Sequence, residues 1–309
     1  MKIYKPRFWD KKNSFIGFLL LPLSIFLQVL IHLRNKTVKE KKNSIPVICV
    51  GNIYIGGTGK TPLAIEIIHT LEKLNKKAAL IKKSYEGHQD EFKLATSRGI
   101  KLFKDSSRHK AINNAIKNNF DCVVLDDGYQ DFSVEKNLNI VCFNEKQMIG
   151  NGMTLPSGPL REPLSSLKRC QIVIINGDNN LEFEKKIKNI NKNISIYYSK
   201  YLPTNVENFK DKKLLAFAGI GNTQNFFDLL EEKNLKIEKK ISFPDHYNYS
   251  LKELNEMINF SIDNKLKLVT TEKDFFRIRH FKLPQIQSLN ISLEIKNKVN
   301  FEKQIAEYL

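Results

Sequence analysis

A glycine-rich segment at residues 51–62 combines the side chains that a phosphate-binding site needs. An apolar run at 45–50 precedes it, and an amphipathic stretch at 63–74 follows it. Glycines let backbone N–H groups approach phosphate oxygens, and the N-terminus of a following helix adds partial positive charge. The segment therefore predicts a nucleotide-phosphate loop made of Gly56, Gly57, Thr58, Gly59, Lys60 and Thr61.

Two side chains of this loop have separate predicted tasks. Lys60 would reach the β- and γ-phosphates of ATP, and the Thr61 hydroxyl would ligate Mg²⁺. The strict pattern G-x-x-x-x-G-K-[ST] has glycine where this chain has Tyr54. The competing interpretation is a glycine-rich turn between strand and helix that binds nothing.

Paired carboxylates follow a second apolar run, at residues 122–125. Asp126 and Asp127 stand where a parallel strand would end, followed by Gly128 and Gln130. An acidic side chain in this position holds magnesium, directly or through water, in enzymes with such a loop. Taken alone, the pair would more readily be a solvated turn. With the loop, it predicts the second half of a magnesium-nucleotide site.

The elements that would position these residues alternate between short apolar runs and amphipathic stretches, as in an α/β fold with a parallel sheet. Strands are predicted at 45–50, 78–82, 122–125, 140–143 and 172–175, with helices at 60–74 and 106–119. A second α/β unit is predicted from about Lys212, with strands at 214–218 and 266–270 and helices at 223–232 and 251–263. We expect a P-loop NTPase-like parallel-sheet domain over 37–205, a smaller α/β domain over 206–309 and an N-terminal apolar membrane helix within 1–36.

The N-terminal segment at 15–33 is nearly free of charge and has lysines before it and Arg34 and Lys36 after it. Its nineteen residues could just span a bilayer, which takes about 20. Pro22 and several polar residues favour instead a helix that lies in, or is partly inserted into, an anionic leaflet. A helix docked on its own domain is the remaining alternative.

Composition adds two weaker indications. A formal net charge of +17 suits an acidic partner such as an anionic membrane or a phosphorylated substrate, although dispersed lysines can also reflect biased composition. The four cysteines lie in or beside apolar runs without C-x-x-C spacing, which favours reduced core thiols over zinc or disulfides.

The order of these motifs resembles that of tetraacyldisaccharide 4′-kinases, the kinases of lipid A biosynthesis. The resemblance includes the GGTGKTP loop, the DDG-x-Q segment at 126–130, a Leu-Pro-Ser-Gly-Pro-Leu-Arg-Glu-Pro run at 155–163, Phe-Pro-Asp-His at 243–246 and Thr-Thr-Glu-Lys-Asp at 270–274. It extends from the apolar N-terminal segment to about Asp274.

This resemblance implies transfer of the ATP γ-phosphate to the 4′-hydroxyl of a tetraacylated glucosamine disaccharide 1-phosphate, with ATP and Mg²⁺ as cofactors. It also implies two α/β domains with the active site between them, at the cytoplasmic face of the bacterial inner membrane. The implied partners are the lipid A disaccharide precursor and an anionic membrane surface, with neither nucleic acid nor an obligate protein partner.

Residue by residue, the resemblance assigns Lys60 and Thr61 to the loop, Asp126 and Asp127 to the acidic pair, and Glu162 to the metal. The implied substrate contacts are Tyr85, Arg108, Gln130 and Arg161. The segment Lys82-Lys83-Ser84-Tyr85 stands in place of the family's Ser-Arg-Gly-Tyr, and Asp131 in place of a frequent histidine.

Asp90 and His246 are the catalytic pair that the resemblance implies. Asp90 lies in Gln-Asp-Glu where the family has Gly-Asp-Glu, and would orient the acceptor hydroxyl and accept its proton. Because an exposed aspartate is a weak base, His246 would hydrogen-bond it and share the proton.

Two classes of protein compete with this interpretation. A membrane-bound P-loop ATPase of the switch or partition type would turn nucleotide binding into conformational change, and a P-loop kinase for a soluble sugar or nucleoside would not need the segment at 15–33. Nucleic-acid binding would rest on charge alone, because no aromatic-basic recognition motif is present.

Overall fold

The computed structural model describes residues 6–83 and 95–309. These residues divide into two compact units. The smaller unit contains residues 95–99 and 201–292, and the larger one contains the rest, including the C-terminal residues 293–309.

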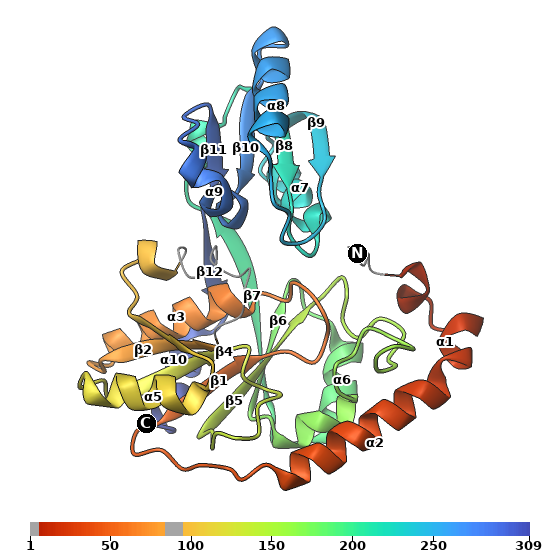
Figure 1. Cartoon of the computed structure of the whole chain (residues 1–309), viewed down its shortest axis with the longest axis vertical. Helices are drawn as coiled ribbons and strands as arrows, with labels where there is room; N and C mark the ends of the chain where they lie inside the picture. The colour runs from red at the N-terminus through yellow and green to blue at the C-terminus, as the bar shows by residue number, and fades with distance from the viewer. Residues whose placement is uncertain (1–5, 84–94) are drawn as a thin grey trace. The chain divides into compact units, whose positions relative to one another are not determined.

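The larger unit is built on a sheet in the order β12-β7-β6-β5-β1-β4-β2-β3 (Figure 1). Its strands are β1 Val47–Gly51, β2 Ala78–Lys83, β3 Leu102–Asp105, β4 Cys122–Asp126, β5 Leu138–Asn144, β6 Ile172–Asn176, β7 Ser195–Pro203 and β12 Ile291–Ile295. The pairings from β3 across to β7 are parallel. Chain crossovers go to both sides of β1, so the loop after β1 opens at the point where the strand order reverses.

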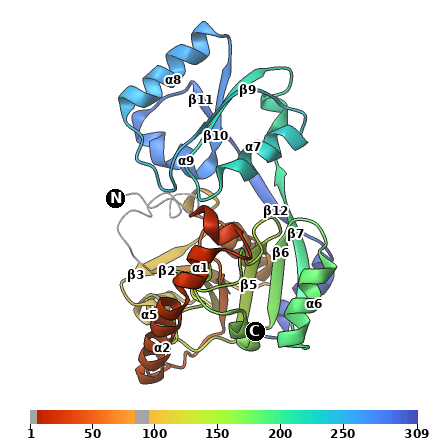
Figure 2. The same cartoon turned by 90° about the vertical axis from the view of Figure 1, so that its right-hand side faces the viewer.

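Helices cover this sheet because its central strands are apolar on both faces, as parallel strands are. The helices are α1 Phe15–Leu19, α2 Leu21–Thr37, α3 Lys60–Lys73, α5 Arg108–Lys117, α6 Leu181–Ile190 and α10 Lys298–Ala306. Residues of α5 and α6 share one core with Val47 and Cys49 of β1. Helix α3 contacts β1, β2 and β4, and Figures 1 and 2 show α6 alongside β6 and β7.

The smaller unit has a parallel sheet in the order β11-β10-β8-β9. Its elements are β8 Lys213–Ala218, α7 Thr223–Glu232, β9 Lys236–Ser242, α8 Leu251–Asp263, β10 Lys267–Thr271, α9 Glu272–Ile278 and β11 Ile286–Leu289. Ser250 and Glu253 form a capping box that begins α8. Separate cores lie on the two faces of the sheet. The prediction of an α/β fold with a large parallel sheet is confirmed.

The N-terminal segment corrects one prediction, because residues 15–33 do not form a single helix. Helix α1 ends at Leu19, and α2 begins at Leu21 with Pro22 in its first turn. Proline has no N–H to donate and its ring clashes with the preceding turn, so a continuous helix is interrupted there. Helix α2 has 17 residues, roughly 26 Å at 1.5 Å each, against a hydrocarbon core of about 30 Å. Among the described residues, no helix combines the length and the apolar character that crossing a membrane requires.

All four cysteines are buried and free. Cys49, Cys122 and Cys142 lie within strands, and Cys170 lies two residues before the start of β6. Burial raises the pKa of Cys49 and of Cys122 to about 11 each, so both are protonated thiols at neutral pH. The cysteines are core residues, in agreement with the prediction from their spacing.

Candidate active site

The loop between β1 and α3 has the geometry of a phosphate cradle. Gly56 and Gly59 have φ of 112° and 94°, values that favour glycine. The buried Asn52 amide donates to the Gly56 carbonyl at 3.3 Å and to the Thr58 hydroxyl at 3.0 Å, which holds the loop in its curve. A Cβ atom added to Gly56 would meet nothing within 4 Å, so this side of the loop is open. Lys60 is the first residue of α3, whose N-terminal N–H groups point toward the loop.

Asp126 meets the loop because β4 pairs directly with β1. The register places Val50 opposite Asp126, the last residue of β4. The Thr61 hydroxyl donates to Asp126 Oδ2 at 2.9 Å. Asp126 Oδ1 is buried and has no hydrogen-bond partner among the described residues. A buried carboxylate oxygen with spare acceptor capacity beside a threonine hydroxyl fits a hard, oxygen-seeking cation such as Mg²⁺.

No group of three or more His, Cys, Asp or Glu side chains that could hold a metal occurs among the described residues. In a magnesium site of the phosphate-loop kind, the nucleotide phosphates and water supply most of the ligands. Thr61 and Asp126 are thus the side chains best placed to hold the ion.

Asp127 faces a different set of groups from its neighbour. Its backbone is left-handed, with φ of 57°, and its carboxylate accepts from Arg161 Nη1 at 2.9 and 3.1 Å. Lys60 Nζ lies 3.8 Å from Asp127 Oδ1. Burial alone would raise the pKa of Asp127, but Lys60 and Arg161 outweigh it and hold that pKa below its usual value. Burial lowers the pKa of Lys60, and the charge of Asp127 opposes that shift.

Gln130, Glu162 and Arg169 form a polar cluster beside the loop, in which Glu162 is buried and the other two are half-buried. The Gln130 amide donates to the Asn52 carbonyl at 2.9 Å and to Glu162 Oε1 at 3.0 Å. Arg169 Nη2 donates to both Glu162 oxygens, at 2.8 and 2.7 Å, and its guanidinium lies over the Tyr129 ring. Glu162 therefore already has two protein partners in the position where the sequence predicted a metal ligand.

Arg108, predicted as a substrate contact, is only 6% exposed. Its Nη1 donates to Asp131 Oδ2 at 2.7 Å, and its Nη2 to the Asp127 carbonyl at 2.7 Å. Burial would raise the pKa of Asp131, but hydrogen bonds from Ser133 and Arg108 lower it to about 2. In this structure Arg108 braces the turn that carries the acidic pair.

His246 lies in the smaller unit, on a left-handed turn with φ of 54°. The backbone N–H of His246 donates to the Gly219 carbonyl at 3.2 Å. On the imidazole ring, Nδ1 lies 3.4 Å from Arg277 Nη2. Arginine has only donors, so Nδ1 is the acceptor and the proton of a neutral His246 ring is on Nε2. Asp245 Oδ1 lies 3.9 Å from Nε2. The predicted residues Tyr85 and Asp90 lie outside the described residues.

Four residues that shape these sites were absent from the predicted set. Lys82, Arg169, Asp274 and Arg277 all make buried or half-buried ion pairs. For Lys82 a signal existed, since it is the first charged residue after an apolar run, as Asp126 is in the neighbouring strand. Asp274 ends the Thr-Thr-Glu-Lys-Asp motif and pairs with Arg277 three residues later in the chain. The Arg169–Glu162 pair depends on a contact that no local pattern indicates.

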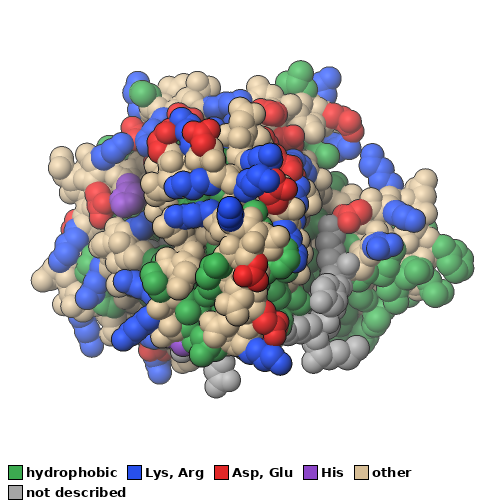
Figure 3. Space-filling model, turned by 90° about the horizontal axis from the view of Figure 1, so that it is seen from above, with side chains coloured by type: hydrophobic (Ala, Val, Ile, Leu, Met, Phe, Trp, Pro, Cys, Tyr) green, Lys and Arg blue, Asp and Glu red, His purple; other side chains and the backbone are tan. Residues whose placement is uncertain are grey.

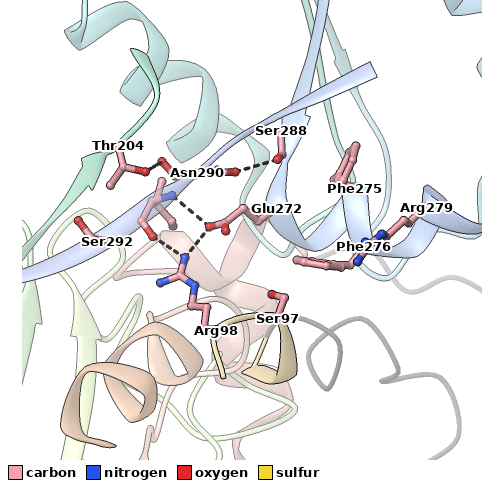
Figure 4. A pocket seen from close by; sticks show the side chains of 11 residues that line it. Ser97, Arg98, Thr204, Glu272, Phe275, Phe276, Arg279, Ser288, Asn290 and Ser292 are labelled. Carbon is pink, nitrogen blue, oxygen red and sulfur yellow. Dashed lines mark hydrogen bonds and ion pairs between the residues drawn. The ribbon is translucent and has the colours of Figure 1, made fainter. Parts of the chain in front are cut away.

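The smaller unit also contains a cavity of about 570 Å³. Figure 4 shows Arg98 pointing toward Glu272, with Phe275 and Phe276 from α9 and Arg279, the residue after α9, along another side. Arg98 donates to Glu272 Oε2 at 2.8 Å and to the Ile291 carbonyl. None of the predicted site residues lines this cavity.

Comparison with known proteins identifies the family. The model of the family described as "Tetraacyldisaccharide-1-P 4'-kinase" matches residues 16–309. The chain belongs to this family. A tetraacyldisaccharide 4′-kinase of Pelagibacter ubique is 43% identical over 99% of this chain and 98% of that protein. One from Rickettsia felis is 29% identical over 97% of this chain and 94% of that protein.

The fold agrees with the same assignment. A crystal structure of LpxK from Aquifex aeolicus, described as an "apo" form in complex with ATP, superposes with a TM-score of 0.74 at 22% identity, covering 95% of this chain and 99% of that one. The resemblance inferred from the motifs of the tetraacyldisaccharide 4′-kinase family is thus confirmed.

Proposed function

We propose that this protein is an ATP-dependent kinase that phosphorylates the 4′-hydroxyl of a tetraacylated glucosamine disaccharide 1-phosphate. The observation that carries the proposal is the junction of β1, β4 and α3. There Lys60 lies 3.8 Å from Asp127, and Thr61 donates to Asp126. The chain that contains this junction belongs to the 4′-kinase family. Family membership also favours a kinase over the P-loop ATPase switch considered from the sequence.

The residues of the larger unit would divide the work as follows. The loop amides and Lys60 bind the ATP phosphates, and the Lys60 ammonium neutralises charge on the transferring group. Thr61 and Asp126 would hold Mg²⁺, which supplies charge neutralisation and orients the phosphates when bound. Arg161 is held by Asp127 and lies on the same turn as Glu162, so its guanidinium can be presented toward an anionic substrate.

Proton transfer from the acceptor hydroxyl would fall to Asp90 with help from His246. The contact with Arg277 at Nδ1 leaves the proton of a neutral His246 ring on Nε2. From Nε2, His246 would steady the Asp90 carboxylate and strengthen it as a base. The remaining site assignments, Tyr85, Arg108, Gln130 and Glu162, stay proposals. The contacts of Arg108 and Glu162 described above support a role in bracing the site more than a role in direct contact with ligands.

The N-terminal helices support association with a membrane surface. Polar side chains of α2 face the protein, because the Ser24 hydroxyl donates to the Thr154 carbonyl at 3.0 Å and the Gln28 amide to the Arg161 carbonyl at 3.3 Å. Most large apolar side chains of both helices are exposed, among them Phe15, Phe18, Leu19, Ile25, Phe26 and Leu33. Figure 3 shows hydrophobic side chains gathered along the right-hand edge, the side on which Figure 1 places α1.

Such an apolar face flanked by lysine and arginine suits an anionic leaflet. We propose peripheral attachment of residues 1–36 to the cytoplasmic face of the inner membrane. The kinase core and the C-terminal domain would follow the predicted division between 37–205 and 206–309, except that residues 293–309 belong to the larger unit. An acylated substrate would then be reached without leaving the bilayer.

The test is transfer of labelled phosphate from ATP to a tetraacylated disaccharide 1-phosphate in detergent micelles. We expect a product phosphorylated at the 4′ position, and no transfer to glucosamine or its soluble phosphates. ATP hydrolysis that vesicles stimulate, without any phosphorylated lipid, would contradict the kinase and support a switch.

A further inference from the structure

A buried lysine occupies the magnesium end of the phosphate site. Lys82 is the fifth residue of β2 (Ala78–Lys83), and only 7% of its side chain is exposed. Its Nζ lies 2.7 Å from Asp126 Oδ2, the same oxygen that accepts from the Thr61 hydroxyl at 2.9 Å. The carboxylate best placed to hold the metal thus already has an ammonium group against it.

The strand register places the two residues side by side. β2 and β4 are parallel neighbours, and Ile81 is opposite Leu125, so the next residue of each strand, Lys82 and Asp126, comes side by side. Both are buried, and a charge in such a place is stable only with an opposite charge close by. The contact is therefore part of the sheet and not a chance meeting of two flexible surface side chains.

We propose that Lys82 is a built-in counter-cation that neutralises Asp126 in the metal-free protein and weakens Mg²⁺ binding there. Two cations would share one buried carboxylate when the metal enters with its nucleotide. Lys82 lowers the affinity for the ion by repulsion, and it keeps the empty site folded by pairing with Asp126. This proposal rests on the proposed use of Mg²⁺ with ATP.

The experiment measures metal binding directly and needs no lipid substrate. The Mn²⁺ concentration that half-saturates the protein with a non-hydrolysable ATP analogue is read by electron paramagnetic resonance in wild type and in Lys82→Met. The Met side chain has nearly the same length and no charge. We expect half-saturation at a concentration about tenfold lower in the variant, because one unit charge a few ångströms from the ion is worth at least a decade in affinity. Lys83→Met, which removes a charge from the opposite face of β2, should leave the value unchanged.

A second measurement follows the metal-free protein. Lys82→Met should melt at a lower temperature than wild type without metal, and added Mn²⁺ with the analogue should raise its melting temperature by more than it raises that of wild type. Lys82→Arg keeps the charge, so this variant should bind Mn²⁺ no more tightly than wild type. If Lys82→Met does not fold, the Mn²⁺ affinity of Lys82→Arg is the test.

The outcomes separate this proposal from the proposed function. Unchanged or weaker Mn²⁺ binding in Lys82→Met, or tighter binding in Lys82→Arg, would overturn the role of Lys82 while leaving the kinase intact. If wild type binds neither the analogue nor Mn²⁺, the proposed function itself fails.

Discussion

Asp274, the last residue of the Thr-Thr-Glu-Lys-Asp motif, should be among the most sensitive positions of the smaller unit. Its carboxylate is fully buried. Oδ2 accepts from the Gly219 N–H at 2.9 Å and from the Thr271 hydroxyl at 2.7 Å. Oδ1 accepts from the Tyr249 hydroxyl at 3.0 Å and from Arg277 Nη1 at 2.6 Å. One side chain thus satisfies four donors, from the residue after β8, from β10, from α9 and from the segment before α8.

Replacing Asp274 by Ala removes the carboxylate that pairs with the Arg277 guanidinium, and only 11% of the Arg277 side chain is exposed. Removing one partner of a buried ion pair typically costs about 3–5 kcal/mol. Total free energies of unfolding are about 5–15 kcal/mol. The variant should therefore lose a large part of the free energy of unfolding of the smaller unit.

The measurement must report on that unit alone, because a chain of two units need not unfold in one step. Trp9, the single tryptophan, lies in the larger unit, so its fluorescence reports on the wrong part of the chain. Native-state hydrogen exchange of the β8 and β10 amides reports on the smaller unit, and we expect protection there to fall by about 3–5 kcal/mol while β1 and β4 keep theirs.

Asp245→Ala is the matched control. This carboxylate lies next to His246 but is 46% exposed, and exposed positions of this kind change stability by about 0.5 kcal/mol or less. Protection in Asp274→Ala could instead stay within roughly 1 kcal/mol of wild type, as expected for a substitution at an exposed position. That result would refute the reasoning from burial and hydrogen bonding.

Four further predictions concern catalysis, membrane binding and pH. Lys60→Ala should reduce kcat on the order of 10²-fold or more with the loop intact; near-normal turnover in a steady-state assay would remove the phosphate-loop interpretation. Single Ala variants of Asp90 and His246 should lose similar large factors, and the double variant little more, because groups that act as a unit are not additive; additive losses would separate the two residues. Replacing the exposed Phe18 and Phe26 by Ser should weaken co-sedimentation with anionic vesicles at least about tenfold, since each buried phenylalanine contributes about 1.5–3 kcal/mol; undiminished binding would place the membrane contact elsewhere. The pKa of Asp131, about 2 in the folded state against an ordinary 3.8, contributes stability that is present above pH 4 and lost as the pH falls toward 2; Asp131→Asn should flatten that part of an acid-unfolding curve, and an unchanged curve would show that another carboxyl dominates it.

The elements that the sequence predicted best are those with a strong local pattern. Helices α7 and α8 occupy 223–232 and 251–263 as predicted, because their apolar residues recur at helical spacing between clear start and stop signals. The charged edge strand β9 and the polar helix α6 were missed. Neither has an apolar run, since one side of each is exposed to solvent.

The phosphate loop and the acidic pair could be found from the sequence because their chemistry is local: glycines, Lys60 and Thr61 are neighbours in the chain, and Asp126 ends a strand. Family membership followed from the order of such local motifs. Only the tertiary structure decided which distant side chains meet them. Lys82 reaches Asp126 through the register of two strands, and the final residues, 293–309, return to the larger unit after the chain has built the smaller one. The physical reason is that burial and pairing depend on neighbours far away in the chain, which no short window of sequence contains.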